Sequence, residues 1–288
     1  MHPVRLAVGV AAVLMTAGLG GCTQDRGDET GERSLDAEVS VPGWPARAGA
    51  AILVEDVRGG LPPPEVAPAR FADVPDFVLF GDGTVIWRRG GSFLTVTLDE
   101  QGVRTALGWA ANVGLLDEGG ADTGEPEVYD LPSAIVDVTT DEGRVTTTVT
   151  APGLDPGSLG LAPAEVTTRA LLSELDVRLR ALPDHLAAAR VVAPVAPLRV
   201  GGWELLSRRA TTYPDLSGAE PTWTLDDPSV GCRTVIGADQ VRLERLLAAQ
   251  GADPGSGRVW AFEGAAWVVF ARPLLPGAPE GCAENLGG

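Results

Sequence analysis

Residues 77–87 read Phe-Val-Leu-Phe-Gly-Asp-Gly-Thr-Val-Ile-Trp. Aromatic and β-branched residues on both sides of a Gly-Asp-Gly turn are typical of a β-hairpin, because glycine tolerates the positive φ angles that such turns require. Alternation of residue types in 93–98 adds another strand. Hairpins pair their strands antiparallel, so this part of the chain favours a fold built on antiparallel sheet.

Two further hairpins follow the same pattern later in the chain. Residues 134–140 and 144–150 are rich in Val and Thr and flank an Asp-Glu-Gly turn. Residues 259–262 and 266–271 flank a Glu-Gly turn in the same way. The sequence therefore predicts three short-turn hairpins.

Three segments carry the apolar period of amphipathic helices, with start and stop signals at their ends. They are 99–114, with Asp99 as the N-cap; 163–182, with Pro163 as the first helical residue; and 239–251, with Asp239 as the N-cap and Gly251 as the C-cap. The Gly119-Gly120 pair is a second stop signal for the first helix, and 184–190 is a weaker helix candidate.

These elements together predict an α+β fold. Antiparallel hairpins form one sheet or several, and about three amphipathic helices pack on one face. The helices share a loose pattern of one Val and a later Leu-Leu pair, which hints at repeated units of hairpin and helix.

Composition narrows the class of protein further. The chain has 288 residues, 44% of them hydrophobic, which is enough for a real core and excludes a collagen-like or wholly disordered chain. The net charge is −17, and all 22 basic residues are arginine. Contact with a nucleic-acid backbone needs clustered cations, so we expect no nucleic acid among the partners.

The N-terminus carries the pattern of an export signal. His2 and Arg5 precede an apolar run, 6–19, of about the length of a signal-peptide core. The run ends in Leu19-Gly20-Gly21-Cys22, which resembles the lipobox of bacterial lipoproteins.

This resemblance implies a cellular location and a covalent modification. Residues 1–21 are a lipoprotein signal peptide, and Cys22 becomes the first residue of the mature chain, carrying a covalent diacylglycerol. No other cofactor is expected. Acyl chains on Cys22 hold the protein at the extracytoplasmic face of the cell membrane. The competing interpretation is an ordinary signal peptide in which Cys22 is incidental.

The rest of the chain divides into a tether and two parts. Residues 22–50 are acidic and contain little that can form a core, so we expect a flexible tether, with Trp44 docking on the domain or exposed for a partner. The first α+β part is 51–190, and the second is 199–288. The Pro-rich segment 191–198 is the linker between them. The sequence leaves open whether the two parts are one domain or two.

Cysteine usage agrees with export. Cys232 and Cys282 remain as an even pair once Cys22 is acylated, so we expect a disulfide between them, in the second part. A metal site is the competing interpretation. Two cysteines without a neighbouring histidine do not supply tetrahedral ligands, so no metal ligand is predicted.

Motifs for catalysis are missing from the sequence. His185 is the one histidine of the mature chain, and a surface or capping role is expected at its helix junction. No Ser lies in a G-x-S-x-G elbow, and without Lys there is neither a Ser-x-x-Lys nucleophile nor a Walker loop. No catalytic residue is therefore predicted, and we expect no enzyme. Carboxylates are plentiful, so a carboxylate-dependent hydrolase of the cell envelope, like a glycoside hydrolase, stays as the alternative.

Aromatic residues offer a candidate binding surface. Trp203 and Trp223 flank a loop that holds Tyr213, and rings exposed there suit a sugar or a partner protein, whereas core packing is the competing interpretation. Residues 267–276 and the first hairpin loosely resemble secreted and lipoprotein sequences of high-GC actinobacteria, a resemblance that implies no activity. We expect a membrane-anchored binding or structural module of the cell envelope, with an envelope protein or glycan as partner.

Overall fold

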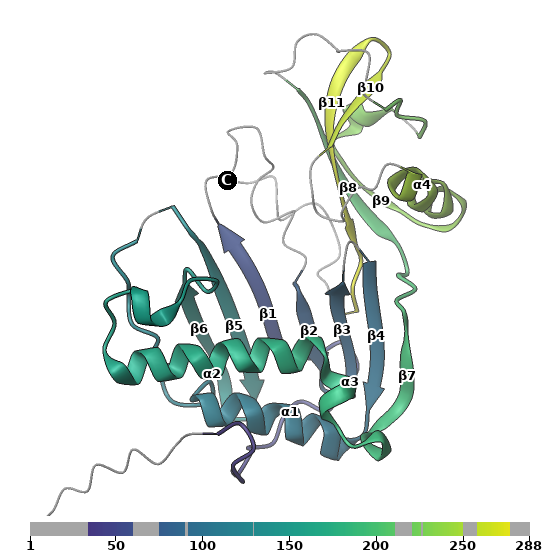
Figure 1. Ribbon diagram of the computed structural model, residues 1–288. Coiled ribbons are helices and arrows are strands. Elements are labelled where there is room, and N and C mark those ends of the chain that lie inside the picture. Colours follow the sequence, from purple (N-terminus) through teal and green to yellow (C-terminus); the bar gives the residue numbers. More distant parts are fainter. Residues whose placement is uncertain are drawn as a thin grey trace, which may run out of the picture. The chain divides into compact units, whose positions relative to one another are not determined.

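The computed structural model describes residues 34–59, 75–89, 92–128, 130–210, 221–225, 227–249 and 258–276. Contacts along the chain separate Met1–Glu32 from Arg33–Gly288, and all of the described residues belong to the second unit. Their strands form two antiparallel sheets, one of seven strands and one of four (Figure 1). Four helices accompany these strands within the described residues, and the predicted α+β fold class is confirmed.

The larger sheet has the strand order β6-β5-β1-β2-β3-β4-β7. Its strands are β1 (Ala51–Gly59), β2 (Phe77–Phe80), β3 (Thr84–Arg89), β4 (Ser92–Leu98), β5 (Pro132–Thr140), β6 (Gly143–Thr150) and β7 (Val191–Pro197). The predicted hairpins β2–β3 and β5–β6 and the predicted strand β4 are confirmed. Strand β1 has no counterpart among the sequence predictions. It joins the two hairpins, because it pairs with β2 on one side and with β5 on the other.

Helices α1 (Glu100–Val113) and α2 (Pro163–Arg180) cover the same face of the larger sheet (Figure 1). The predicted ends of α1 are confirmed. The Asp99 side chain accepts a hydrogen bond from the backbone N–H of Gly102 at 2.7 Å. Gly114 ends the helix at a φ of 92°, in the left-handed region that glycine adopts without strain.

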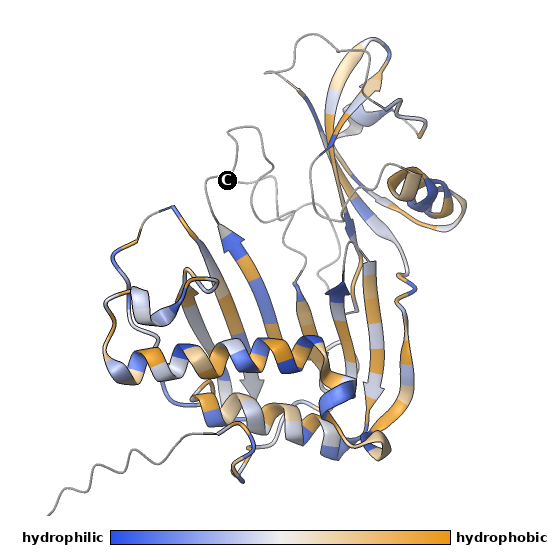
Figure 2. Ribbon diagram, viewed as in Figure 1, coloured by the Kyte–Doolittle hydropathy of each residue, from blue (hydrophilic) through white to orange (hydrophobic). Residues whose placement is uncertain are grey.

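In place of the short helix predicted at 184–190, the structure has two separate short helical segments. Helix α3 (Leu182–His185) follows α2 directly, and a 3₁₀ turn (Ala188–Arg190) leads into β7. Figure 2 shows hydrophobic and hydrophilic residues alternating along α2 and along the strands of the sheet. This alternation gives each element one apolar side to bury.

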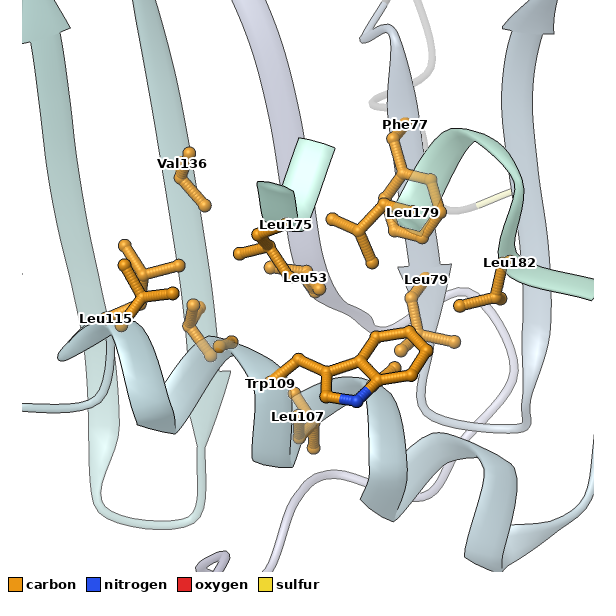
Figure 3. Packing of buried hydrophobic residues seen from close by; sticks show 14 of the residues in the cluster. Leu53, Phe77, Leu79, Leu107, Trp109, Leu115, Val136, Leu175, Leu179 and Leu182 are labelled. Atoms are coloured by element: carbon orange, nitrogen blue, oxygen red, sulfur yellow. The ribbon is translucent and has the colours of Figure 1, made fainter. Parts of the chain in front are cut away.

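Apolar side chains from the larger sheet and from both helices meet in one layer, the core layer (Figure 3). Leu53 and Leu79 reach it from the sheet, Leu107 from α1 and Leu175 from α2. All four are fully buried. Burial of such a side chain contributes about 1.5–3 kcal/mol, so this layer is what holds the helices to the sheet.

The smaller sheet has the strand order β10-β11-β8-β9. Its strands are β8 (Trp203–Arg209), β9 (Cys232–Val235), β10 (Arg258–Phe262) and β11 (Ala265–Pro273), and the third predicted hairpin, β10–β11, is confirmed. Helix α4 (Gly237–Ala249) starts two residues before the predicted cap, and its Leu243 belongs to one buried cluster with Trp203 and Val235. The helices are thus divided between the sheets instead of sharing one face.

Residues 34–50 are part of the folded body, whereas a flexible tether is predicted for 22–50. Leu35 is 1% exposed and belongs to the core layer. The Asn112 side chain of α1 donates hydrogen bonds to the backbone carbonyls of Leu35 and Ala37, at 2.9 and 2.8 Å. A single buried leucine has no repeating pattern around it, so the sequence gives no sign of this docking.

Trp44 also docks on the body, as one of its two expected roles. The indole packs against the core layer, and its Nε1 donates to the carbonyl of Gly81 at 3.3 Å. The guanidinium of Arg104 lies over the ring, 5.0 Å from its centre. Residues 22–33 of the predicted tether lie outside the described residues.

The Pro-rich segment 191–198, predicted as a linker, forms the edge strand β7 of the larger sheet. It pairs with β4, with two shifts of register. Proline has no N–H to give to a ladder, but an edge strand is paired on one side only, so Pro194 and Pro197 are tolerated there. The prediction of a linker is therefore wrong, and the break between the sheets falls after β7.

Truncation of Leu35 tests whether the N-terminal segment belongs to the fold. Leu35→Ala is expected to lower the free energy of unfolding by about 2–4 kcal/mol, because the surroundings of a buried leucine leave a void when it is shortened. Glu38→Ala, in the same segment but exposed, is the control and should stay within about 0.5 kcal/mol of the parent chain. Urea unfolding followed by tryptophan fluorescence measures both, and equal stability of the two variants would contradict the docking.

Candidate functional site

A cavity of about 530 Å³ lies between helix α2 and the larger sheet. Strands β1, β5 and β6 contribute one side of it, and the loop 152–156 contributes another. Most of the lining is apolar: Val57, Ala134, Val136, Val149, Leu172, Leu175 and Leu179. Figure 3 shows three of these residues, Val136 on the sheet and Leu175 and Leu179 on the helix. This size and this lining are typical of sites for small molecules.

The loop beside the cavity starts from a strained residue. Ala151 follows β6 directly, is buried, and has a φ of 56°, in the left-handed region. Two backbone hydrogen bonds hold it there, from its own N–H to Pro132 O at 2.8 Å and from Leu154 N–H to its carbonyl at 3.2 Å. This conformation costs a non-glycine residue about 1–2 kcal/mol, and it turns the chain toward the cavity.

Arg169 links α2 by hydrogen bonds to the backbone of the loop at 123–124 and of the end of β6. The residue is buried, and its guanidinium donates to the carbonyls of Thr123 at 2.6 Å, Thr150 at 2.7 Å and Gly124 at 3.1 Å. Arg169 also lines the cavity. Because its nitrogens are already engaged with the backbone, we assign it a structural role there.

The polar end of the cavity is formed around Glu55 of β1. Side chains alternate along a strand, and Glu55 is paired with Val136 of β5 and Phe77 of β2, both members of the core layer. Glu55 therefore points toward the helices. It is 6% exposed and lines the cavity. An acidic group in an apolar layer is unfavourable unless it is neutralised or paired.

Charged groups from three elements lie around Glu55. Arg180 Nη2 of α2 is 3.8 Å from Glu55 Oε1 and 3.9 Å from Asp76 Oδ2. The Nε of the same arginine donates a hydrogen bond to Asp176. Asp76, just before β2, accepts a hydrogen bond from Arg88 Nη2 of β3 at 2.6 Å. Asp176 is thus hydrogen-bonded to Arg180, and Asp76 to Arg88. Neither arginine donates a hydrogen bond to Glu55, although Arg180 lies 3.8 Å from it.

Glu55 is neutral at physiological pH. Burial, the negative charge of Asp176 and a hydrogen bond with Asp176 raise its pKa to about 9, although Arg180 opposes the shift. The protonated carboxyl donates this hydrogen bond to Asp176. Its Oε2 atom is buried and accepts no hydrogen bond from any residue that the structure describes. The site therefore combines an apolar cavity with a neutral carboxyl.

The aromatic residues predicted for binding do not form an exposed surface. Trp203 and Trp223 are 7% and 3% exposed and lie in the core of the smaller sheet. Trp203 Nε1 donates to Glu244 Oε1 of α4 at 3.1 Å, and Trp223 meets Trp260 edge to face with ring centres 5.3 Å apart. An exposed role for these two rings is therefore wrong, because the sheet uses them as its largest core residues. Tyr213 lies outside the described residues.

The predicted modifications fall mostly outside the described residues. Cys22 and Cys282 are not among them, and Cys232 is the first residue of β9. Cys232 is disulfide-bonded, whereas its pairing with Cys282 and the lipidation of Cys22 stay predictions. His185, the last residue of α3, is exposed, and its ring meets that of Trp109 edge to face at 6.5 Å between centres.

Sequence reasoning missed Glu55 and the strand that carries it. Residues 51–57 read Ala-Ile-Leu-Val-Glu-Asp-Val, a run in which apolar β-formers precede two acidic residues. The acidic pair hides the strand, because it breaks the apolar run after four residues. An acidic residue in phase with the buried positions of a strand is the signal that could have found the site.

In the described parts of the chain, no three His, Cys, Asp or Glu residues are grouped so as to hold a metal ion. None of the described helices combines the length and the apolar character needed to cross a bilayer. Comparison with protein-family models, curated proteins and solved structures finds no match for this chain. A function has to be inferred from the residues of the site themselves.

The raised pKa of Glu55 makes stability depend on pH. Between its ordinary pKa of 4.5 and its folded value of about 9, the folded chain holds a proton that the unfolded chain has lost. The stabilisation is complete below about pH 4.5 and is lost as the pH rises toward about 9. In this window Glu55 lowers the free energy of unfolding by at most about 1.4 kcal/mol per pH unit.

Glu55→Gln is expected to flatten this dependence, because an amide stays neutral at every pH and can still donate to Asp176. Denaturant unfolding at several pH values between about 4.5 and 9 measures the slope. Glu174→Gln, on the exposed side of α2, removes a carboxyl outside the cavity and should keep the slope of the parent. The interpretation of Glu55 is wrong if its Gln variant and the parent share one slope.

Proposed function

We propose that this chain is a lipid-anchored binding module of the cell envelope, which holds a small and mostly apolar molecule in the cavity under α2. The cavity is the observation that carries the proposal: about 530 Å³, with an apolar lining, between a helix and a sheet. Contact between such an apolar lining and water is unfavourable. A ligand that fills the space removes this cost.

The rim of the cavity supports entry by an apolar molecule. Val177 of α2 and Leu154 of the neighbouring loop both line the cavity, and they are 59% and 43% exposed. Apolar side chains that are exposed next to a cavity commonly mark a binding site. We therefore place the entrance between α2 and the loop 152–156.

Anchorage at the membrane is the second element of the proposal. It is supported by the lipobox-like sequence that ends in Cys22 and by the apolar run before it. Two acyl chains attach a protein to a bilayer far more firmly than one. An anchored module of this kind suits a ligand that is poorly soluble in water.

A carboxylate-dependent hydrolase fits the site less well. Glycoside hydrolases keep their two carboxyls about 5–9.5 Å apart, with the scissile bond between them. Glu55 and Asp176 instead share a hydrogen bond, and Asp176 is also bonded to Arg180. This leaves no space between the two carboxyls for a substrate, so binding is the function that the geometry supports.

Filling the cavity tests the proposal. Ala134→Phe places a ring in the space that the ligand uses, and it is expected to weaken binding of the neutral apolar fluorophore N-phenylnaphthylamine at least about tenfold. Fluorescence titration measures this affinity, with the chain expressed from residue 22 and carrying Cys22→Ala so that no lipid is attached.

Ala170→Phe is the matched control, because it adds the same ring on the exposed side of α2. It is expected to bind the fluorophore like the parent chain, and thermal unfolding of both variants checks that they fold. Lack of saturable binding by the parent, or equal binding by the two Phe variants, would contradict the proposal.

Mass spectrometry of the native protein tests the anchor. The expected mature chain begins at Cys22 and carries diacylglycerol on its sulfur. Cys22→Ala should release the chain from the membrane fraction, since the thiol is the site of attachment. A native chain that begins at Met1, or that has an unmodified Cys22, would overturn this element and leave cavity binding to be judged on its own test.

A further inference from the structure

The polar end of the cavity also points to the chemistry of the ligand, an inference that rests on the proposed binding function. We propose that Glu55 recognises an uncharged hydrogen-bond donor, such as a hydroxyl group, on an otherwise apolar ligand. The ligand class is then an apolar alcohol or a similar neutral donor, in place of a fatty acid or an alkyl amine.

The first observation is an acceptor without a donor. Glu55 lines the cavity, and its Oε2 atom is buried. No described residue donates a hydrogen bond to this atom. Leaving a buried acceptor unpaired is unfavourable. A ligand donor placed beside this carboxyl supplies the hydrogen bond that the protein itself does not.

The carboxyl of Glu55 can serve Asp176 and a ligand together. One oxygen carries the proton that is donated to Asp176, and the other is free to accept. The terminal torsion of a glutamate side chain is broad. A small rotation about it can therefore open the buried Oε2 to the cavity, while the other oxygen keeps its hydrogen bond to Asp176 and β1 stays in place.

The second observation is the balance of charge. With Glu55 protonated, Asp176 pairs with Arg180, and Asp76 pairs with Arg88. A carboxylate or ammonium group on the ligand would add an uncompensated charge to a layer of low polarity, which is costly. A hydroxyl group adds a donor and leaves the charges balanced.

The other charged residues of the lining do not change this balance. Arg169 is engaged with three backbone carbonyls. Asp155 is exposed, and its side chain accepts a hydrogen bond from the backbone N–H of Gly157. Neither offers a free buried partner for a charged head group.

Two substitutions of Glu55 separate its hydrogen bonds from its charge. Glu55→Gln imitates the protonated acid, since its amide donates to Asp176 and its carbonyl still accepts from a ligand. Glu55→Leu keeps the bulk and removes the acceptor. Glu174→Leu, on the exposed side of α2, is the control for loss of a carboxylate.

Four ligands with the same alkyl chain test the recognition: decanol, its methyl ether, decylammonium and decanoate. Each displaces N-phenylnaphthylamine from the chain with Cys22→Ala, near neutral pH. The parent is expected to bind decanol about five- to tenfold tighter than the methyl ether, which lacks the donor, and tighter than both ions. Glu55→Gln and Glu174→Leu should keep this preference. In Glu55→Leu the ratio of the affinities for decanol and for its methyl ether should fall to about one.

The outcomes distinguish the two proposals. If no ligand displaces the fluorophore and Ala134→Phe changes nothing, the binding function and this inference both fail. If decanol and its ether bind equally while Ala134→Phe weakens both, the cavity binds apolar molecules and the role of Glu55 is wrong. Tighter binding of decylammonium or decanoate also overturns it. Should Glu55→Leu not fold, the preference of the parent for alcohol over ether, and its retention in Glu55→Gln, decide the matter.

Discussion

The apolar core layer between the larger sheet and its two helices is the constraint on which the rest of the structure depends. Apolar strand faces have to be covered, and α1 and α2 are the elements that cover this one. Val103, Leu107 and Val113 of α1 are buried in this layer. Between α2 and the sheet lies the cavity, and the small Ala134 of β5 is one of its lining residues. The layer therefore explains both the stability of the fold and the place of the site.

Polar contacts along α2 explain why the helix does not settle into this space. Arg169 is tied to three backbone carbonyls near the start of the helix. Asp176 and Arg180 are bonded to each other near its end, and Arg180 also lies next to Glu55 of the sheet. Moving α2 inward would break these contacts. Glu55 itself is buried against the core layer, and this burial is the main cause that raises the pKa of its carboxyl.

The sequence could predict the parts of the fold that are encoded within a few residues. The turn at Gly81-Asp82-Gly83 and the Asp99 cap are local, so the hairpin and the start of α1 follow from them. Strand β7 is different, because it pairs with β4 from a distant part of the chain and its prolines resemble those of a linker. Glu55 and Asp176 are likewise far apart in the chain, and no spacing or period connects them. Their contact exists only once α2 lies on the sheet.

If Cys22 is the lipid anchor, the docking of Leu35 on the folded body sets the length of the linker between the anchor and the body. Only thirteen residue steps separate the two positions, and a fully extended chain of that length spans about 45 Å at most. A linker that extended from Cys22 to the first strand would have a maximum length more than twice as great. An anchor at Cys22 would therefore keep Leu35, and the body on which it docks, within about 45 Å of the bilayer surface.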